Sequence, residues 1–492
     1  MSNSDLMLIL IFSPMVFGVL GSALINKNIL DKFFLSFSYF ILVLSSYLYY
    51  QFAYQGYEPI SVLNNWISIG ETKVEFYFKL DGLNAPLVLL GGILTVVAVH
   101  ASRSIKDRKR EYYLWMFLLI SGVFGVFLSF DLILFFFFFE LEIIPLFFLI
   151  SIWGSGRKEY SAMKFLLFTL SGSAMMIAGF LCLYFSSAGT GTFNIDTLSS
   201  TNFEWVIPST FVFILIFVGF SIKLPMFPLH GWLPDAHTDA PTAASVLLAG
   251  LLLKMGGYGI LRICYFIMPN EAIELSEIIS VFGAVSVIYG AFLTLRQTDL
   301  KRIVAFSSVS HMGYILIGIS AFASNDMTFK TLGLSGASFQ MVSHGLITGL
   351  LFYLVGIIYE KCKTREVSSL GGLATQFKFT SIALAISGMA SLGLPGTSGF
   401  VSELMIFMGG FHKFSITTSV SVFGVVLAAG YILWMLQRVI YGELNPKYSK
   451  LNDMNFVEKI PVVILIVSII FLGIYPKFIT DVLNIGIAGI VN

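Results

Sequence analysis

The sequence predicts an all-α polytopic membrane protein with about fourteen transmembrane helices, and three observations support this fold class. Only 12% of the residues are charged and 57% are hydrophobic, whereas a typical soluble domain carries about 25% charged residues. Apolar runs of membrane-spanning length follow one another along the whole chain. Two of these runs are interrupted by proline at corresponding places, which is typical of transporters built from repeats.

The predicted spans are 6–26, 33–53, 83–101, 112–129, 131–152, 161–186, 206–223, 241–267, 276–295, 302–322, 331–359, 379–409, 414–437 and 459–479. The longest connections, 54–82, 187–205 and 438–458, leave no room for a soluble domain, so 1–492 is expected to form a single membrane domain. The first run has an acidic flank, Asp5, and no basic segment, which favours a retained helix over a cleaved signal peptide.

The distribution of basic residues predicts the orientation in the membrane. Twenty of the 29 Lys and Arg residues, Lys27 and Lys301 among them, fall in the connections after odd-numbered spans. Five fall in the connections on the other side: Lys73, Lys79, Lys330, Lys413 and Lys477. The positive-inside rule places the first set on the cytoplasmic or equivalent side. With an even number of spans, both termini are expected outside.

Helices 7 and 12 are predicted to be discontinuous. The first breaks at Lys223-Leu224-Pro225 and the second at Gly393-Leu394-Pro395-Gly396. The breaks are five helices apart, and because five is odd the second copy would be inverted. We therefore expect helices 1–3 over 1–111, one five-helix repeat over 112–267, an inverted repeat over 268–441, and helix 14 over 442–492.

Few ionisable residues lie deep in the apolar runs, and they predict a proton path. In chain order they are Glu140, Lys223, Lys254, His311, His344 and Glu403. Such groups are costly in hydrocarbon, so they are expected to pair or to line a hydrated path. Each one alone is also compatible with a satisfied contact between helices. All six can exchange protons, and together they favour a relay.

Two acidic residues compete for the role of partner to Lys223. Glu140 and Glu142 are two residues apart, so on a helix they point to nearly opposite faces and cannot form one dyad. We predict that Glu140 and Lys223 interact between helices 5 and 7. Lys164 and Arg262 lie nearer helix ends and are expected to be interfacial anchors.

Other chemistries lack support in the sequence. Cys182, Cys264 and Cys362 form no CxxC, and phosphate-binding glycine motifs are absent. The sequence has no basic tail of the kind that would indicate nucleic-acid binding. The loop 229–239 holds four potential metal ligands, His230, Asp235, His237 and Asp239. Its prolines favour a tight helix junction over a metal site, so we expect no bound metal in this chain.

The motifs around these residues resemble one membrane-protein family. They are FFELEIIP, KLPMFPLHGWLPDAHTDAP, LLLKMGGYG, SSVSHMGY and SLGLPGTSGFVSE, within a similarity extending from about Asp81 to Lys477. The segments are similar to those of the antiporter-like membrane subunits of respiratory complex I, the proton-pumping NADH:quinone oxidoreductase. The resemblance implies fourteen helices, two inverted five-helix repeats and one proton channel.

The resemblance also implies a role for each residue. Glu140 and Lys223 resemble the input pair of the family, and Glu403 its output group. Lys254, His311 and His344 resemble its central relay. Related chains of the complex and the sodium/proton antiporter subunits carry lysine where Glu403 stands, so the resemblance favours the branch of the family that carries glutamate there. Glu142 is a departure that is more similar to cyanobacterial and plastid versions.

Partners and cofactors follow from the same resemblance. It implies antiporter-like neighbours on both sides, small membrane subunits and the lipid bilayer as partners. Flavin, iron–sulfur clusters and quinone would belong to partner subunits, with no redox centre in this chain. A bacterial inner membrane is expected, with thylakoid and mitochondrial inner membranes as alternatives. Three other interpretations remain open: a cation/proton antiporter, a ferredoxin-driven photosynthetic complex and a structural scaffold.

Overall fold

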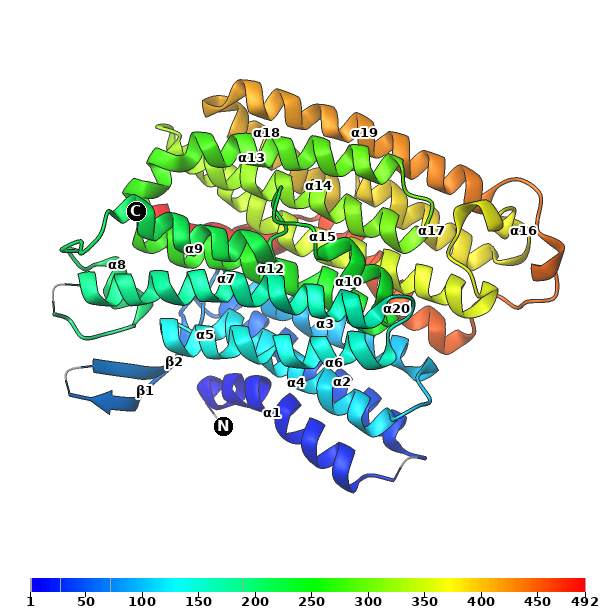
Figure 1. Ribbon diagram of the computed structural model, residues 1–492, viewed down its shortest axis with the longest axis horizontal. Coiled ribbons are helices and arrows are strands. Elements are labelled where there is room, and N and C mark those ends of the chain that lie inside the picture. Colours follow the sequence, from blue (N-terminus) through cyan, green and yellow to red (C-terminus); the bar gives the residue numbers. More distant parts are fainter. Residues whose placement is uncertain (1, 27, 71, 188, 492) are drawn as a thin grey trace.

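The computed structural model describes residues 2–26, 28–70, 72–187 and 189–491. Its helices lie side by side with their axes mostly along one direction (Figure 1). All fourteen predicted spans are helical. Within the described residues, twelve helices are long and apolar enough to cross a membrane. The predicted fold class, an all-α integral membrane protein, is confirmed.

The first half of the chain contains the first seven spans and a β-hairpin. The spans are α1 (Asn3–Leu24), α2 (Leu30–Tyr54), α3 (Ala85–Ala101), α4 (Lys109–Leu128), α5 (Leu132–Leu141) continued by α6 (Ile143–Trp153), α7 (Lys158–Ser186) and α9 (Ser209–Lys223). The short α8 (Ile195–Ser199) and α10 (Leu233–Asp239) lie in the connections. Since α9 has only 15 residues, about 22 Å of helix, it is too short to cross a membrane alone. The predicted break in helix 7 is therefore present.

The second half begins with a composite helix 8. It consists of α11 (Thr242–Leu247), the π-helical turn η2 (Leu248–Leu252), α12 (Leu253–Gly259) and a second π-helical turn, η3 (Ile260–Tyr265). The remaining helices are α13 (Pro269–Leu295), α14 (Leu300–Ser320), α15 (Met327–Cys362), α16 (Leu373–Gln376), α17 (Lys378–Ser391), α18 (Ser398–Lys413), α19 (Ser415–Ile440), α20 (Phe456–Ile474) and α21 (Lys477–Val491). The gap between α17 and α18 is the predicted break in helix 12.

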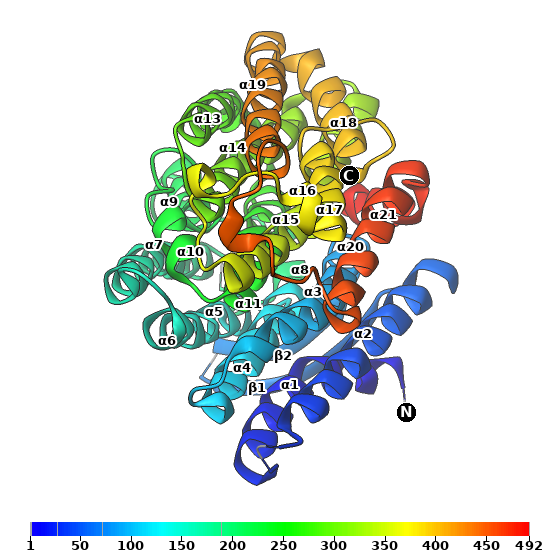
Figure 2. The ribbon, with the colours of Figure 1, turned by 90° about the vertical axis from the view of Figure 1, so that its right-hand side faces the viewer.

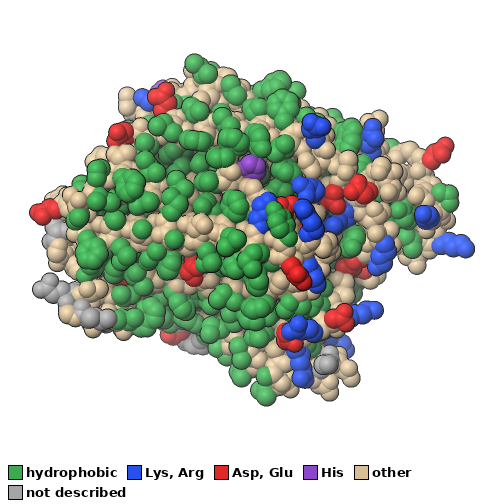
Figure 3. Space-filling view, in the orientation of Figure 1, with side chains coloured by type: hydrophobic (Ala, Val, Ile, Leu, Met, Phe, Trp, Pro, Cys, Tyr) green, Lys and Arg blue, Asp and Glu red, His purple; other side chains and the backbone are tan. Residues whose placement is uncertain are grey.

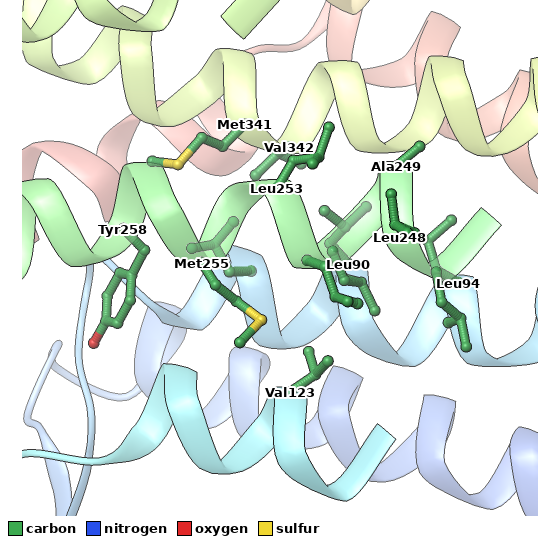
Figure 4. Close-up of a cluster of buried hydrophobic side chains, with 14 of the residues drawn as sticks. Leu90, Leu94, Val123, Leu248, Ala249, Leu253, Met255, Tyr258, Met341 and Val342 are labelled. Carbon is green, nitrogen blue, oxygen red and sulfur yellow. The ribbon is translucent and has the colours of Figure 1, made fainter. Parts of the chain in front are cut away.

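Helix 8, α14 and α15 form the centre of the bundle. The membrane-length stretches in 242–265, 300–323 and 327–362 are completely buried, whereas only 28% of the stretch in α20 is buried. Seen along the helices, α15 is surrounded by other helices, while α19 and α7 lie at the periphery (Figure 2). Leucine, methionine and valine side chains of α3, α4, helix 8 and α15 interdigitate around this centre (Figure 4). A charge on these helices is therefore far from lipid.

Two elements were not predicted from the sequence. A β-hairpin, β1 (Ile60–Ile69) and β2 (Thr72–Leu80), pairs antiparallel within the 54–82 connection. In β2 the alternate residues Val74, Phe78 and Leu80 are buried, as expected for a strand with one buried face. Helix 14 ends at Ile474, before Pro476, and a separate amphipathic helix, α21, follows.

The charged side chains are unevenly distributed between the two ends of the molecule. Both termini lie toward the left in Figure 1, and the Lys and Arg side chains on that face gather toward the right in Figure 3. This separation fits the predicted asymmetry of basic connections. Lys27, which belongs to that set, lies outside the described residues. Which side of the membrane each end faces stays a prediction.

Candidate proton-relay site

A buried ion pair occupies the break in helix 7. Lys223 is the last residue of α9, and its Nζ donates a hydrogen bond to Oε1 of Glu142. The two side chains are 1% and 0% exposed. The ammonium also lies 5.1 Å from the centroid of the Phe139 ring. A helix C-terminus carries partial negative charge, which stabilises a cation at this position.

The partner of Lys223 differs from the predicted one. Glu142 stands at the junction of α5 and α6, against α4, where a Cβ on Gly122 would lie 3.2 Å from the Glu142 Cβ. Glu140 is only partly buried, and its Oε1 has no hydrogen-bond partner among the described residues. The ion pair of Lys223 is therefore formed with Glu142, while the charges of Glu140 and Lys223 act on each other without an ion pair among the described residues. The two carboxylates point to different faces, and the one that meets α9 belongs to Glu142.

Lys254 lies at the centre of helix 8, on the short α-helical segment between the two π-helical turns. Its Nζ donates to the carbonyl oxygen of Ala249 and lies 2.8 Å from Nδ1 of His344 on α15. Single π-helical turns inside α-helices are frequent at functional sites. An amine and an imidazole nitrogen at this distance can exchange a proton directly.

The line continues from His344 to Glu403 through His311. The ring centroids of His344 and His311 are 5.5 Å apart. His311 Nδ1 lies 3.5 Å from Glu403 Oε1, and Ser391 Oγ lies 3.4 Å from His311 Nε2. A cavity of about 10 Å³ between α14, α15 and α18 is lined by these groups, which is close to the space that one water requires.

The break in helix 12 touches the end of this line. Gly393 has φ +78°, and a Cβ there would lie 2.6 Å from Glu403 Oε2. Gln340, on α15, accepts a hydrogen bond from Ser402 and lies 3.5 Å from His311 Nδ1. The loop therefore packs against the carboxylate of Glu403, and Gln340 lies beside the His311 ring that contacts this carboxylate.

The structure therefore brings together four of the six predicted site residues. Lys254, His344, His311 and Glu403 form one line across four neighbouring helices, and Lys223 forms a separate pair with Glu142. The two parts are adjacent, because a Cβ on Gly256 would lie 2.7 Å from the Leu224 backbone nitrogen at the helix 7 break. Among the described residues Glu140 forms no ion pair with either part, although its charge acts on Lys223.

Two buried cationic or imidazole groups near this line were not assigned to it from the sequence. Lys301 was counted as a loop cation, but it is 2% exposed and its Nζ donates to the Ala240 carbonyl at 2.6 Å. His237 is 0% exposed and stacks on Phe352 at 4.7 Å between centroids. In the sequence His237 lies in a proline-rich stretch that resembles an exposed loop. In the structure this stretch forms α10, which is folded back into the bundle and buries the ring.

The loop acidic residues serve as ion-pair partners. Asp235 pairs with Lys164 at 2.7 Å and with Arg302 at 3.3 Å. Asp81 pairs with the buried Arg262 at 2.5 Å. The expectation that Arg262 is an interfacial anchor is therefore wrong, while the same expectation for Lys164, which is 25% exposed, stays a prediction. The described residues contain no group of three or more His, Cys, Asp or Glu side chains placed to hold a metal ion.

Comparison with known proteins identifies the family. Residues 129–428 match the family described as NADH:quinone oxidoreductase/Mrp antiporter, TM. The chain belongs to this family. Subunit M of the NADH-quinone oxidoreductase of Rhodobacter capsulatus is 37% identical over 455 residues, which cover 89% of this chain and 86% of that protein. Chain 4 of the chloroplastic NAD(P)H-quinone oxidoreductase of Chaetosphaeridium globosum is 36% identical, covering 91% and 89%.

Solved structures agree on the architecture. A chain of respiratory complex I from Thermus thermophilus with bound NADH superposes with a TM-score of 0.85, at 24% identity over 99% of this chain and 100% of that one. A chain of the Mrp complex from Dietzia sp. DQ12-45-1b gives 0.86, at 21% identity over 100% and 98%. At these identities the likeness shows the fold. The resemblance stated from the motifs is confirmed.

Proposed function

We propose that this chain is the proton-translocating membrane subunit of a complex-I-type NADH:quinone oxidoreductase. The observation that carries the proposal is the line from Lys254 through His344 and His311 to Glu403, buried across four central helices. A continuous series of protonatable groups in a membrane interior marks a proton pathway. The relatives named subunit M and chain 4 support the same assignment.

Each group in the line has a chemical role. Lys254 holds a proton and passes it to Nδ1 of His344, which lies 2.8 Å away. Each imidazole accepts a proton at one ring nitrogen and donates from the other. Glu403 receives the proton and releases it when a positive charge arrives nearby, because a cation favours the ionised carboxylate.

The ion pair of Lys223 and Glu142 supplies the change in charge that moves protons along the line from Lys254 to Glu403. While the pair is closed, the two charges compensate each other. Opening it leaves an ammonium at the helix 7 break, which packs against Gly256 of helix 8, and this ammonium is proposed to repel a proton held on Lys254. Glu140 lies on the other face of α5, and we propose that its protonation changes the charge that acts on Lys223 and so favours opening of the pair.

The remaining features of the assembly are part of the proposal. Electron transfer from NADH to quinone takes place in partner subunits that hold flavin and iron–sulfur clusters, and this chain contributes no redox centre. Antiporter-like subunits lie on both sides of it, with small membrane subunits around them. It resides in a bacterial inner membrane, with the basic connections inside and both termini outside, and its two five-helix repeats are inverted.

The test is proton pumping by the purified complex in liposomes, normalised to quinone reduction. Glu403→Gln removes the titratable group with little change in shape, so we expect an assembled complex that has lost proton output. Glu403→Lys restores a titratable group and is expected to retain more pumping than Glu403→Ala. Glu274→Gln, at an exposed position of α13, is the matched control. Full pumping by Glu403→Gln would remove this residue from the pathway.

A cation/proton antiporter subunit is the second candidate. The likeness in fold to the chain of the Mrp complex favours it, while the glutamate at position 403 favours the first proposal. Co-purification with iron–sulfur subunits separates the two. A ferredoxin-driven complex is a variant of the first, supported by the resemblance of Glu142 to cyanobacterial and plastid versions, and is distinguished by supplying NADH or reduced ferredoxin to the purified assembly.

A further inference from the structure

A cavity of about 280 Å³ lies at the end of the bundle where α3, α15 and α20 meet. It is separate from the small cavity at Glu403. Exposed residues Arg103, Ser104 and Asn455 line it, together with the buried Tyr353 and Gly356. These exposed residues lie in connections that belong to the basic side of the membrane in the predicted orientation. The cavity therefore extends from the surface at that side into the protein.

Polar groups make the cavity suitable for water. The buried His100 lines it, and its Nδ1 has no hydrogen-bond partner among the described residues. The other ring nitrogen, Nε2, lies 3.1 Å from the Tyr39 hydroxyl. A buried polar atom without a protein partner is normally satisfied by water, and the volume has room for several waters. The carboxylates of Glu360 and Glu458 also line the cavity and attract protons to its mouth.

One face of α15 connects this cavity with the relay. Gly356, Phe352, Thr348 and His344 follow one another at intervals of four residues, so they share a helix face. Gly356 lines the cavity, Phe352 stacks on His237, and the Thr348 hydroxyl lies 3.5 Å from His344 Nδ1. The cavity thus ends about three helical turns from the relay.

His237 stacks on Phe352, which lies one turn of α15 from Gly356 and one turn from Thr348. Both of its ring nitrogens lack a hydrogen-bond partner among the described residues. The charges of Lys254 and Lys301 both act on this ring. The Nζ of Lys301 also lies 3.3 Å from Ser245 Oγ. Ser245 in turn donates to the His237 carbonyl at 3.1 Å. An imidazole in this position has one nitrogen free to accept a proton and another to donate one.

We propose that this cavity, the α3–α15 vestibule, is the water-filled proton inlet from the basic side of the membrane, and that His237 carries protons from it to Lys254. The proposal rests on the proposed function. A hydronium ion in the vestibule passes its proton through bridging water to one nitrogen of His237 and becomes water. The imidazolium then gives the proton of its other nitrogen, again through a bridging water, to the neutral amine of Lys254, which has already passed its own proton to His344. The ring returns to the neutral form, and no further reactant is consumed.

The floor of the vestibule offers a specific way to close it. A Cβ on Gly356 would lie 2.3 Å from Cγ2 of Thr242. Gly356→Ala is therefore expected to fill the floor and reduce pumping per quinone reduced. Adding Thr242→Ala removes the clashing atoms and is expected to restore pumping, which separates blockage from misfolding. Gly430→Ala, where the nearest atom would be 3.7 Å away, is the control.

Thiol labelling tests for water without using activity. In the assembled complex with the three native cysteines replaced, a cysteine at Ser104 or at His100 is expected to react with a membrane-impermeant reagent in inside-out vesicles. A cysteine at Ala98, which is buried on the same helix away from the vestibule, is expected to stay unreacted. If His100→Cys is as unreactive as Ala98→Cys, the cavity is dry and the proposal is overturned.

The role of His237 is tested separately. His237→Gln is expected to lose proton pumping while the complex still assembles, and His412→Gln, at the far end of α18, serves as the control. Normal pumping by both His237→Gln and Gly356→Ala would overturn the inlet. In that case loss of pumping in Glu403→Gln would still support the proposed function, so the two proposals fail independently.

Discussion

The buried pair of Lys223 and Glu142 allows a quantitative prediction of stability. Both side chains are almost completely buried, at 1% and 0% exposure, so solvent screening does not weaken the interaction. Removing one member leaves an uncompensated charge in the interior, which costs about 3–5 kcal/mol. We therefore expect Glu142→Gln to destabilise the subunit by roughly this amount. The destabilisation is smaller if Lys223 loses its proton, because the buried amine is then uncharged.

A double-mutant cycle isolates the pair. Glu142→Gln combined with Lys223→Met leaves no buried charge, and replacing a buried pair by uncharged groups is often close to neutral. The double variant is therefore expected to be more stable than Glu142→Gln alone, with a coupling energy of about 1–3 kcal/mol. The assay is thermal unfolding of the purified complex, in which the loss of this subunit's protection from proteolysis reports its unfolding.

Glu140→Gln is the matched control for this cycle. It removes a carboxylate two residues away that is only partly buried and makes no ion pair among the described residues. We expect it to change stability by less than about 1 kcal/mol, as is usual for a group away from buried networks. Equal destabilisation by Glu140→Gln and Glu142→Gln, with no coupling to Lys223, would refute the assignment of the pair.

Three further predictions follow from particular residues. Ile105→Cys is expected to resist a membrane-impermeant thiol reagent in intact cells and to react in inside-out vesicles, and the reverse result would invert the proposed orientation. Gly393→Ala is expected to cost about 1–3 kcal/mol and to reduce pumping, because φ is +78° and the new Cβ would lie 2.6 Å from Glu403 Oε2. Unchanged thermal stability and pumping would contradict this. Asp81→Asn is expected to destabilise the subunit more than Asp196→Asn, as seen by thermal unfolding, because Arg262 is 3% exposed while Lys79 is 21% exposed.

The sequence predicts the fold well because the physics of membrane helices is local. Long apolar runs identify the spans, and proline marks the breaks before Pro225 and Pro395. The central position of Lys254 and His344 in their spans also follows from counting residues. Their contact with each other depends on which helices are neighbours, and only the three-dimensional packing gives that information.

Three particular features depend on packing that a sequence pattern does not contain. The helix is interrupted at Glu142, so the helical phase does not tell which of Glu140 and Glu142 faces Lys223. Lys301 begins a helix and resembles a loop cation, but α10 covers it. The hairpin strand at 72–80 has a short alternating pattern that is weak beside the long apolar runs around it.

The direction of the relay line has a consequence for the electrical work of pumping. Lys254, His344, His311 and Glu403 each lie well inside a different helix, and the contacts between them run from helix to helix. A proton moving along this line travels largely parallel to the membrane plane. The membrane potential does work of about 2.3 kcal/mol per 100 mV only on a charge that crosses the whole membrane. The voltage dependence of pumping should therefore reside in the steps that lead protons to Lys254 and away from Glu403.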